Sequence, residues 1–323
     1  MLLVRGGNSV IIIDGHCDVL WKMYENPLIN FYEPQQAELD VNYENIIRSG
    51  VKIQCFAIYL PESIKQPKFD DYLEYINIFY QKIAINDKLT VIKNQSDLLQ
   101  VMNGTKVGAI LTLEGADAIN DHSLYTQILY HLGVRMIGVT WNYANWAADG
   151  ILEARKGGFS KKGKRFIKEC NDLGIILDAS HLSVRSFWDL ADHSSSPIVA
   201  THSNAEAVCK HPRNLKDDQI RALIIKGGRI GMTFVPWFVS DAGTASIAQL
   251  IKHIEHVCAL GGEKHVVLGS DFDGFDKKIT DLEHTGQMDN LAQQLSRFYS
   301  DQTVEGFLYR NWFSFFKTNL PVS

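Results

Sequence analysis

The sequence predicts a (β/α)8 barrel that occupies residues 1–323 as a single domain. Eight short runs of apolar β-forming residues alternate with segments of helical periodicity, which is the order of elements in this barrel. A doubly wound open sheet is the alternative, but it requires a glycine-rich nucleotide-binding turn after an early strand, and the sequence contains none. No linker, repeat or change of composition divides the chain, so we expect one folding unit.

The predicted strands are rich in Val, Ile and Leu, the pattern of strands that are buried on both faces. The first is typical, because Val10 to Ile13 form a continuous β-forming run that ends at Asp14 and Gly15. The eight strands are expected over residues 10–13, 51–59, 107–113, 134–140, 174–178, 197–201, 229–234 and 265–269.

The predicted helices lie between these strands and carry apolar residues at spacings of three and four. Ser96, Ser160, Ser183 and Asn214 are candidate N-caps, since their side chains can accept a hydrogen bond from a free backbone N–H. Helices are expected at residues 72–84, after Ser96, from Ser160 to before Gly174, after Ser183, after Asn214, at 247–260 and at 303–316.

The composition is that of a globular protein without a nucleic-acid or membrane partner. Apolar residues make up 46% and charged residues 21%, and the net charge of −5 offers no basic surface for nucleic acid or anionic lipid. No apolar run approaches the roughly 18 to 20 residues needed to span a bilayer. The apolar run at 10–13 is too short for a signal peptide, and the five cysteines form no CxxC pair. We expect a cytoplasmic location and reduced thiols.

The end of the first strand suggests a metal site. His16 and Asp18 are separated by one residue, so on an extended chain their side chains point the same way. Divalent ions such as Zn²⁺ accept imidazole nitrogen together with carboxylate oxygen. Cys17 lies between them and is expected to point away.

Other strands end in residues of the same kind. Each could be structural by itself, but ligand-type side chains at the same end of five strands predict a metal site. The set consists of His16, Asp18, Glu114, His181, His202 and Asp271.

The ligand count predicts two zinc ions per chain. Three imidazoles and two carboxylates exceed what one tetrahedral zinc with an open position requires. Glu114 lies between the first and fifth strands, so it is the natural bridging carboxylate. His16 and Asp18 then complete one site, and His181 and His202 complete the other. A water or hydroxide between the two ions would be ionised near neutral pH.

The motifs around these residues resemble those of the membrane (renal) dipeptidase family, the M19 metallopeptidases of the amidohydrolase superfamily. The resemblance covers essentially the whole chain in order. The motifs that carry it are His16-x-Asp18, Leu113-Glu114-Gly115, Ser180-His181, His202-Ser203-Asn204, Arg213-Asn214 and GSDFDG at residues 269–274.

The resemblance implies a barrel of the metallo-dependent hydrolase type that cleaves dipeptides, often with a D-residue at the C-terminal position. Glu114 and Asp271 would be catalytic. Arg213 would hold the free carboxylate of the substrate, which a guanidinium matches with two hydrogen bonds. Asp271 would bind the substrate ammonium and handle the proton of the attacking hydroxide. Asp273 is expected to cap the turn that follows.

The sequence departs from the family pattern at the fourth strand end. Mammalian members carry a His there that is proposed to bind the substrate carbonyl, whereas this chain has Trp141. Trp offers one N–H and no charge, so that role would pass to a metal or to Asn142, and both residues are expected at the substrate. Tyr143, Trp146 and Trp237 are further candidates for the pocket wall. The secretion signal and lipid-anchor tail of mammalian members are not found in the sequence.

The leading interpretation is therefore a zinc dipeptidase with a small dipeptide substrate. Another amide hydrolase on the same site, such as an N-acyl amino acid deacylase, is the alternative among enzymes. A binding protein that retains metals without turnover is the alternative outside enzymes, although such a protein would be expected to lose ligands. The preferred dipeptide, its stereochemistry, the native metal and a homodimeric assembly stay open.

Overall fold

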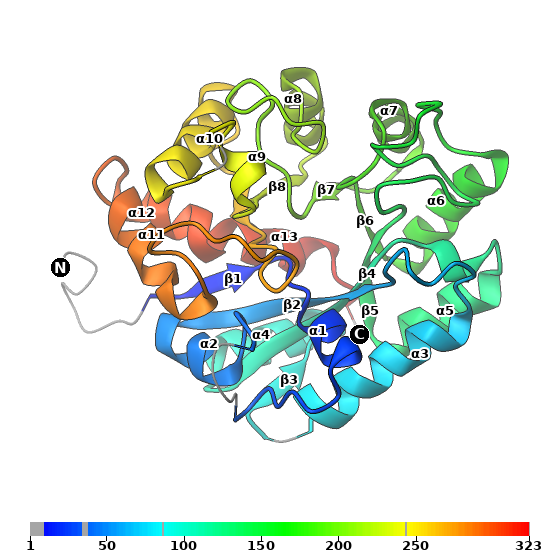
Figure 1. Cartoon of the computed structure of the whole chain (residues 1–323), viewed down its shortest axis with the longest axis horizontal. Helices are drawn as coiled ribbons and strands as arrows, with labels where there is room; N and C mark the ends of the chain where they lie inside the picture. Colours follow the sequence, from blue (N-terminus) through cyan, green and yellow to red (C-terminus); the bar gives the residue numbers. More distant parts are fainter. Residues whose placement is uncertain (1–9, 34–37, 86, 243, 323) are drawn as a thin grey trace.

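The computed structural model describes residues 10–33, 38–85, 87–242 and 244–322. Eight parallel strands form a closed ring with helices around it (Figure 1), which confirms the (β/α)8 barrel. The ring closes where β2 pairs with β4. Its strands are β1 (Ile12–Asp14), β2 (Val51–Tyr59), β4 (Val107–Glu114), β5 (Val134–Gly138), β6 (Ile176–Asp178), β7 (Val199–Ala200), β8 (Arg229–Met232) and β9 (Val266–Leu268).

One strand was not expected. The short β3 (Leu89–Val91) pairs with the first residues of β4, from Val107 to Ala109. The ring neighbour β5 pairs only with the later part of β4, beginning at Leu111. Because β4 extends beyond the ring at its amino end, it leaves backbone groups there that β3 satisfies.

Helices alternate with the strands as expected, but five helices lie outside the predicted segments: Val19–Glu25, Tyr43–Ser49, Ser123–Leu132, Pro236–Val239 and Met288–Leu295. In chain order they are α1 (Val19–Glu25), α2 (Tyr43–Ser49), α3 (Phe69–Ile78), α4 (Gln95–Asn103), α5 (Ser123–Leu132), α6 (Lys161–Leu173), α7 (Val184–His193), α8 (Asp217–Ile225), α9 (Pro236–Val239), α10 (Ile247–Ala259), α11 (Met288–Leu295), α12 (Asp301–Glu305) and α13 (Asn311–Asn319). Two π-helical turns, η1 (Phe79–Ile83) and η4 (Gly306–Arg310), continue α3 and α12, and two 3-10 turns are η2 (Asp117–Ile119) and η3 (Thr285–Gln287).

Two of the four cap predictions are confirmed. Ser160 and Ser183 accept backbone N–H groups at the starts of α6 and α7. Ser96 is not a cap, because Asn94 accepts the N–H of Asp97 at the start of α4. The prediction that Asn214 caps a helix is wrong as well.

The Asn214 side chain faces the interior of the loops instead of the start of α8. Its amide donates to the carbonyl oxygens of Cys209 and Phe238, and Lys216 is the residue that precedes α8. A buried amide that joins two loops satisfies backbone groups that water cannot reach.

The interior of the barrel forms a second apolar cluster together with the C-terminal helix. Inward-facing strand residues such as Ile13, Ile110 and Val267 pack with Trp312 and Phe316 of α13. Figure 1 shows α13 (red) crossing behind the ring of strands. The Trp312 indole donates to the Leu268 carbonyl oxygen, so this large side chain is both buried and hydrogen-bonded. The helix therefore supplies part of the core on which the strands rest.

Among the described residues, every helix is too short or too polar to cross a lipid bilayer.

Replacing Trp312 by Ala should lower the free energy of unfolding by about 3–5 kcal/mol, because the loss of a fully buried indole leaves a cavity. Urea denaturation measures the change. The control is Lys317→Ala on the exposed side of the same helix, for which we expect less than about 0.5 kcal/mol. Equal effects of the two variants would contradict the structural role of α13.

Candidate metal centre

The side chains of metal-ligand type lie where strands of the ring end. Parallel strands bring their carboxyl ends to one face of a barrel, so residues far apart in sequence meet there. His16 and Asp18 follow β1, Glu114 ends β4, and His181, His202 and Asp271 follow β6, β7 and β9. The structure brings all six together in three overlapping groups, and within each group the ligand atoms lie within 4.8 Å of one another.

The loops after β1 and β9 are joined by hydrogen bonds. The buried Asp14 carboxylate accepts the backbone N–H and the hydroxyl of Ser270, at 2.8 and 2.6 Å. The Asp271 N–H donates to the His16 carbonyl oxygen at 3.2 Å. Asp18 is the residue before helix α1. These contacts hold His16 and Asp271 at a fixed separation, because both loops share one anchor.

Glu114 lies between two groups of ligands. Its Oε2 is 3.3 Å from the His16 Nε2, and its Oε1 is 2.8 Å from the His181 Nε2 and 3.7 Å from the His202 Nε2. The two oxygens therefore face different imidazoles, as a carboxylate must do if it is to contact two ions.

The second nitrogens of His181 and His202 fix the orientation of both rings. The Nδ1 of His181 lies 2.8 Å from the Asn142 Oδ1, which can only accept. The Nδ1 of His202 lies 2.8 Å from the hydroxyl of Thr201, which donates to Asp178 and so accepts from the ring. Both neutral rings thus carry the proton on Nδ1 and present the Nε2 lone pair to the centre, the usual arrangement for a metal-bound imidazole.

The cluster fits a divalent metal. The Nε2 atoms of His181 and His202 are 2.8 Å apart, so both rings can direct a lone pair at one divalent ion. The His16 Nε2 and Asp18 Oδ1 are buried and have no hydrogen-bond partner among the described residues. Unpaired buried polar atoms of ligand type are expected where an ion completes the structure.

The charges of the cluster perturb its own protonation. Burial by itself would lower the pKa of His16, but the carboxylates of Glu114 and Asp18 raise it well above its usual range. Burial and the positive charge of Arg213 lower the pKa of His181 to about 4. Without metal, a proton on His16 therefore balances part of the carboxylate charge. A divalent ion at this point competes with that proton.

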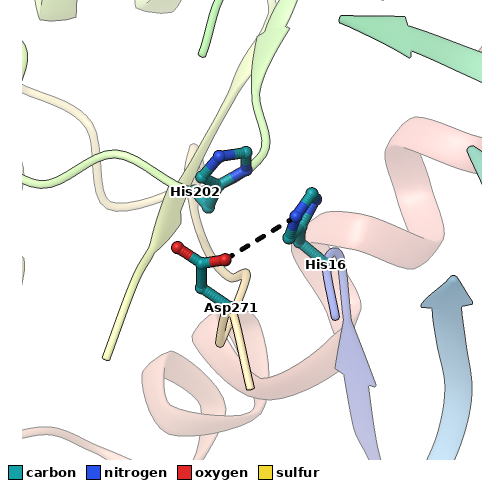
Figure 2. A group of neighbouring side chains, drawn as sticks. All are labelled: His16, His202 and Asp271. Carbon is teal, nitrogen blue, oxygen red and sulfur yellow. Dashed lines mark ion pairs between the residues drawn. The ribbon is translucent and has the colours of Figure 1, made fainter. Parts of the chain in front are cut away.

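Asp271 faces the same centre from β9. Figure 2 shows His16, His202 and Asp271 directed toward one another from three separate elements, with the Asp271 Oδ1 3.7 Å from the His16 Nε2. Its backbone has a φ of 67°, in the left-handed region that residues other than glycine seldom adopt. Burial raises the pKa of Asp271 to about 8, against the opposing charge of His16. In the metal-free protein this carboxyl therefore holds a proton at neutral pH.

The neighbouring Asp273 has a different role from the expected one. Its carboxylate does not cap the following turn but accepts the backbone N–H groups of Asp40 and Val41, at 2.8 and 3.0 Å. It joins the loop after β9 to a distant segment and leaves Asp271 as the carboxylate of this motif that faces the site.

Arg213 is a buried cation without an acidic partner. Its Nη2 donates to the His202 carbonyl oxygen at 3.3 Å, and its guanidinium lies 5.4 Å from the centre of the Phe238 ring. Its Nε has no hydrogen-bond partner, and the guanidinium forms no ion pair within the described chain. Burial of an unpaired charge is costly, so this geometry favours an anionic ligand.

A cavity of about 310 Å³ opens onto the cluster. Trp141 and Asn142 line it as expected, and so do Arg213 and Asp271. Trp237 also lines it. The full set of wall residues is Asp18, Trp21, Tyr59, Glu114, Trp141, Asn142, His181, Arg213, Val235, Trp237, Phe238, Asp271, Gly274 and Phe275.

The other two aromatic candidates lie outside this cavity. Trp146 donates its indole N–H to the Ala116 carbonyl oxygen and packs edge-on against Phe166. Tyr143 is half-exposed and lines a neighbouring hollow. The sequence analysis did not predict that Trp21 and Tyr59 line the cavity. Their positions, shortly after the first strand and at the end of the second, could have indicated it.

The barrel, with buried imidazoles and carboxylates converging at the carboxyl ends of its strands, defines a metal-dependent hydrolase. The sequence profile of the family described as "Membrane dipeptidase (Peptidase family M19)" matches residues 7–320. The chain therefore belongs to this family of metallopeptidases and is a hydrolase that acts on peptide bonds.

Two relatives show the extent of the similarity. The uncharacterized protein in the pqqA 5′ region of Klebsiella pneumoniae is 32% identical over 259 residues, which are 73% of this chain and 94% of that protein. Dipeptidase tcpJ of Claviceps purpurea is 27% identical over 255 residues. That alignment covers 77% of this chain but only 60% of the fungal protein.

Two solved structures share the fold over nearly the whole length. Dipeptidase AC, a metallopeptidase of family M19, superposes with a TM-score of 0.89 at 24% identity, covering 98% of this chain and 100% of that one. A metallopeptidase from Rhodobacter sphaeroides, bound to a phosphinate mimic of the dipeptide L-Ala-D-Ala, superposes with a TM-score of 0.87 at 24% identity. The superposition covers 97% of this chain and 100% of that one.

Metal affinity should rise with pH over the range just above 6.5, the ordinary pKa of histidine. Because the pKa of His16 in the metal-free protein is raised, a proton must leave before the ring can bind metal, and this competition weakens as pH increases. Competition with a chelator at a series of pH values measures the affinity. A pH-independent affinity across this range would contradict the role of His16.

Proposed function

We propose that the protein is a zinc-dependent dipeptidase that hydrolyses free dipeptides, including those with a D-residue at the C-terminus. One observation carries the proposal: the unpaired Arg213 and the carboxyl of Asp271 open onto the same small cavity as the metal-ligand cluster. A free dipeptide has one amide with a cationic and an anionic end, and this cavity offers a partner for each of the three groups.

Two zinc ions are proposed to occupy the cluster. His16, Asp18 and Glu114 would hold one ion, and Glu114, His181 and His202 the other. When bound, such a pair supplies a shared water or hydroxide that is ionised near neutral pH, and it polarises the scissile carbonyl. Asn142 and Thr201 keep the two imidazoles in the ligating tautomer.

Arg213 would bind the substrate carboxylate. Its guanidinium is held by the His202 carbonyl oxygen and the Phe238 ring, so little side-chain freedom is lost when a carboxylate binds. Its planar fork can form two hydrogen bonds with both carboxylate oxygens. Binding at this point fixes the distance between the substrate's C-terminus and the reacting amide.

Asp271 would bind the substrate ammonium and accept the proton released from the attacking water. Its carboxylate lines the cavity and can take up that proton and pass it to the departing amine. Its position 3.7 Å from the His16 Nε2 places it beside the proposed first ion.

Asn142 is proposed to support the reacting carbonyl in the place of the histidine that mammalian members carry. Its Oδ1 is bound to His181, so its amide N–H groups are left to donate to a ligand in the cavity that Asn142 lines. Trp141, 5.9 Å from His181 between ring centres, would shape the wall beside it.

Tolerance of a C-terminal D-residue is supported by the Rhodobacter sphaeroides peptidase, which binds a mimic of L-Ala-D-Ala. Arg213 recognises the carboxylate and not the side chain, so inversion at the last α-carbon leaves this contact available.

The metal count tests the bridged site. Purified metal-replete protein should contain about two zinc ions per chain, and Glu114→Gln should lower both occupancy and activity, because a neutral amide bridges two cations poorly. Elemental analysis measures the content. Glu74→Gln, the same change on the exposed face of α3, should leave it unchanged. One ion per chain in the native protein would refute the bridge.

Substrate selection tests the dipeptidase itself. We expect kcat/KM for a free dipeptide to exceed that for its N-acetyl form and for the matched tripeptide by at least about 100-fold. An N-acetyl group leaves Asp271 without its cation. An added residue moves the scissile carbonyl, and a misplacement of roughly 1 Å costs about 100-fold.

The same three substrates separate the alternatives. Comparable rates for the N-acetyl form would remove the ammonium-binding role of Asp271 and favour a deacylase. Metal-replete protein that binds these compounds without cleaving any of them would instead favour a metal-retaining binding protein.

A further inference from the structure

A second and larger cavity, of about 700 Å³, lies between the loops that follow β5, β6 and β7. It shares His181 and Arg213 with the smaller cavity at the metal centre. Because one guanidinium lines both cavities, a ligand whose carboxylate is held by Arg213 lies at the boundary between them.

The walls of this second cavity are largely apolar. Ile151, Leu182, Trp188 and Leu215 contribute to them, and Trp188 is only partly buried. Such a surface suits the hydrocarbon part of a ligand, since it removes apolar area from water.

The rim of the cavity is cationic. Lys156, Arg185 and Lys216 line it with exposed side chains, and none of the three forms an ion pair within the described chain. Glu206 is the one carboxylate among the lining residues, all of which are described. Arg185 also lies in the first turn of the ten-residue helix α7, whose free N–H groups add positive potential.

Two buried polar groups beside the cavity have unused hydrogen-bonding capacity. Ser203 is 1% exposed and Arg213 is 5% exposed, and both line the cavity. The Ser203 hydroxyl and the Arg213 Nε have no partner among the described residues. Buried polar groups are normally paired, so these two point to a polar ligand at the inner end of the cavity.

We propose that this cavity is the subsite for the side chain of the substrate's C-terminal residue, and that it favours a side chain that ends in a carboxylate. The inference rests on the proposed function, because it takes Arg213 as the partner of the α-carboxylate. The α-carbon is bonded to that carboxylate, so its side chain begins where the two cavities meet. An acidic side chain then extends along the apolar wall toward Lys156 and Arg185.

The test compares Ala-Glu, Ala-Gln and Ala-Gly, with the last residue of the first two in both L and D forms. Metal-replete wild-type protein should cleave the preferred isomer of Ala-Glu about tenfold faster in kcat/KM than its neutral isostere Ala-Gln, as expected for a few partly exposed ion pairs. In a Lys156→Glu/Arg185→Glu variant this ratio should fall to about one or below, and hydrolysis of Ala-Gly should stay within about twofold.

The substituted side chains are exposed, and a carboxylate in the first turn of α7 is favourable for the helix, so we expect the variant to fold. Thermal unfolding checks this, and Arg185→Glu alone serves if the double variant is unstable. Lys161→Glu is the matched control for Arg185→Glu: it makes the same charge change in the first turn of α6, outside the lining of the cavity. It should keep the wild-type ratio.

The outcomes separate the subsite from the proposed function. If Ala-Gly is cleaved but kcat/KM is about the same for Ala-Glu and Ala-Gln, the subsite proposal is wrong and the dipeptidase proposal stands. The same holds if the double variant keeps the wild-type preference for Ala-Glu. If no dipeptide is cleaved, the dipeptidase fails, and calorimetry then tests the subsite directly. Glutarate should bind about tenfold more tightly than butyrate to the wild type but not to the double variant, and equal affinities overturn the subsite.

Discussion

Three imidazoles and three carboxylates at one point, five of the six buried, are the constraint on which the rest of the structure depends. Carboxylates cannot all remain charged in a poorly solvated site unless cations compensate them. Protons do so in the metal-free protein, as the raised pKa values of His16 and Asp271 indicate. Divalent ions do so better, since each carries two charges and needs the same lone pairs. The cluster is therefore organised for metal before any substrate is considered.

The barrel holds these charged side chains in place through hydrogen bonds from residues beneath them. Asp14 holds the loop after β9, Asn142 orients His181, and Thr201 orients His202. Below these contacts the interior is apolar and is completed by Trp312 of the last helix. This rigid support is needed because the side chains of the cluster repel one another. If they could move apart, they would lose the geometry that a metal ion requires.

In the proposed dipeptidase, substrate specificity would come from the loops and not from the ring. The six residues of the cluster end a strand or closely follow one, whereas Arg213 and the rim of the larger cavity lie farther along the connections. Arg213 has a special position, since it separates the small cavity at the metal centre from the large one. Changes in these loops can alter which dipeptide binds and leave the metal chemistry intact.

The sequence by itself determined the barrel and the six side chains at its carboxyl end. Both follow from local patterns, namely buried β-forming runs and polar residues just after them. Tertiary structure alone decided which partners these side chains take. Asp273 binds the backbone of Asp40, a residue 233 positions away, and Asn214 joins two loops instead of capping a helix. The larger cavity beside Arg213 was also beyond prediction. Periodicity describes neighbours along the chain, whereas contacts between distant loops depend on how the finished barrel packs them.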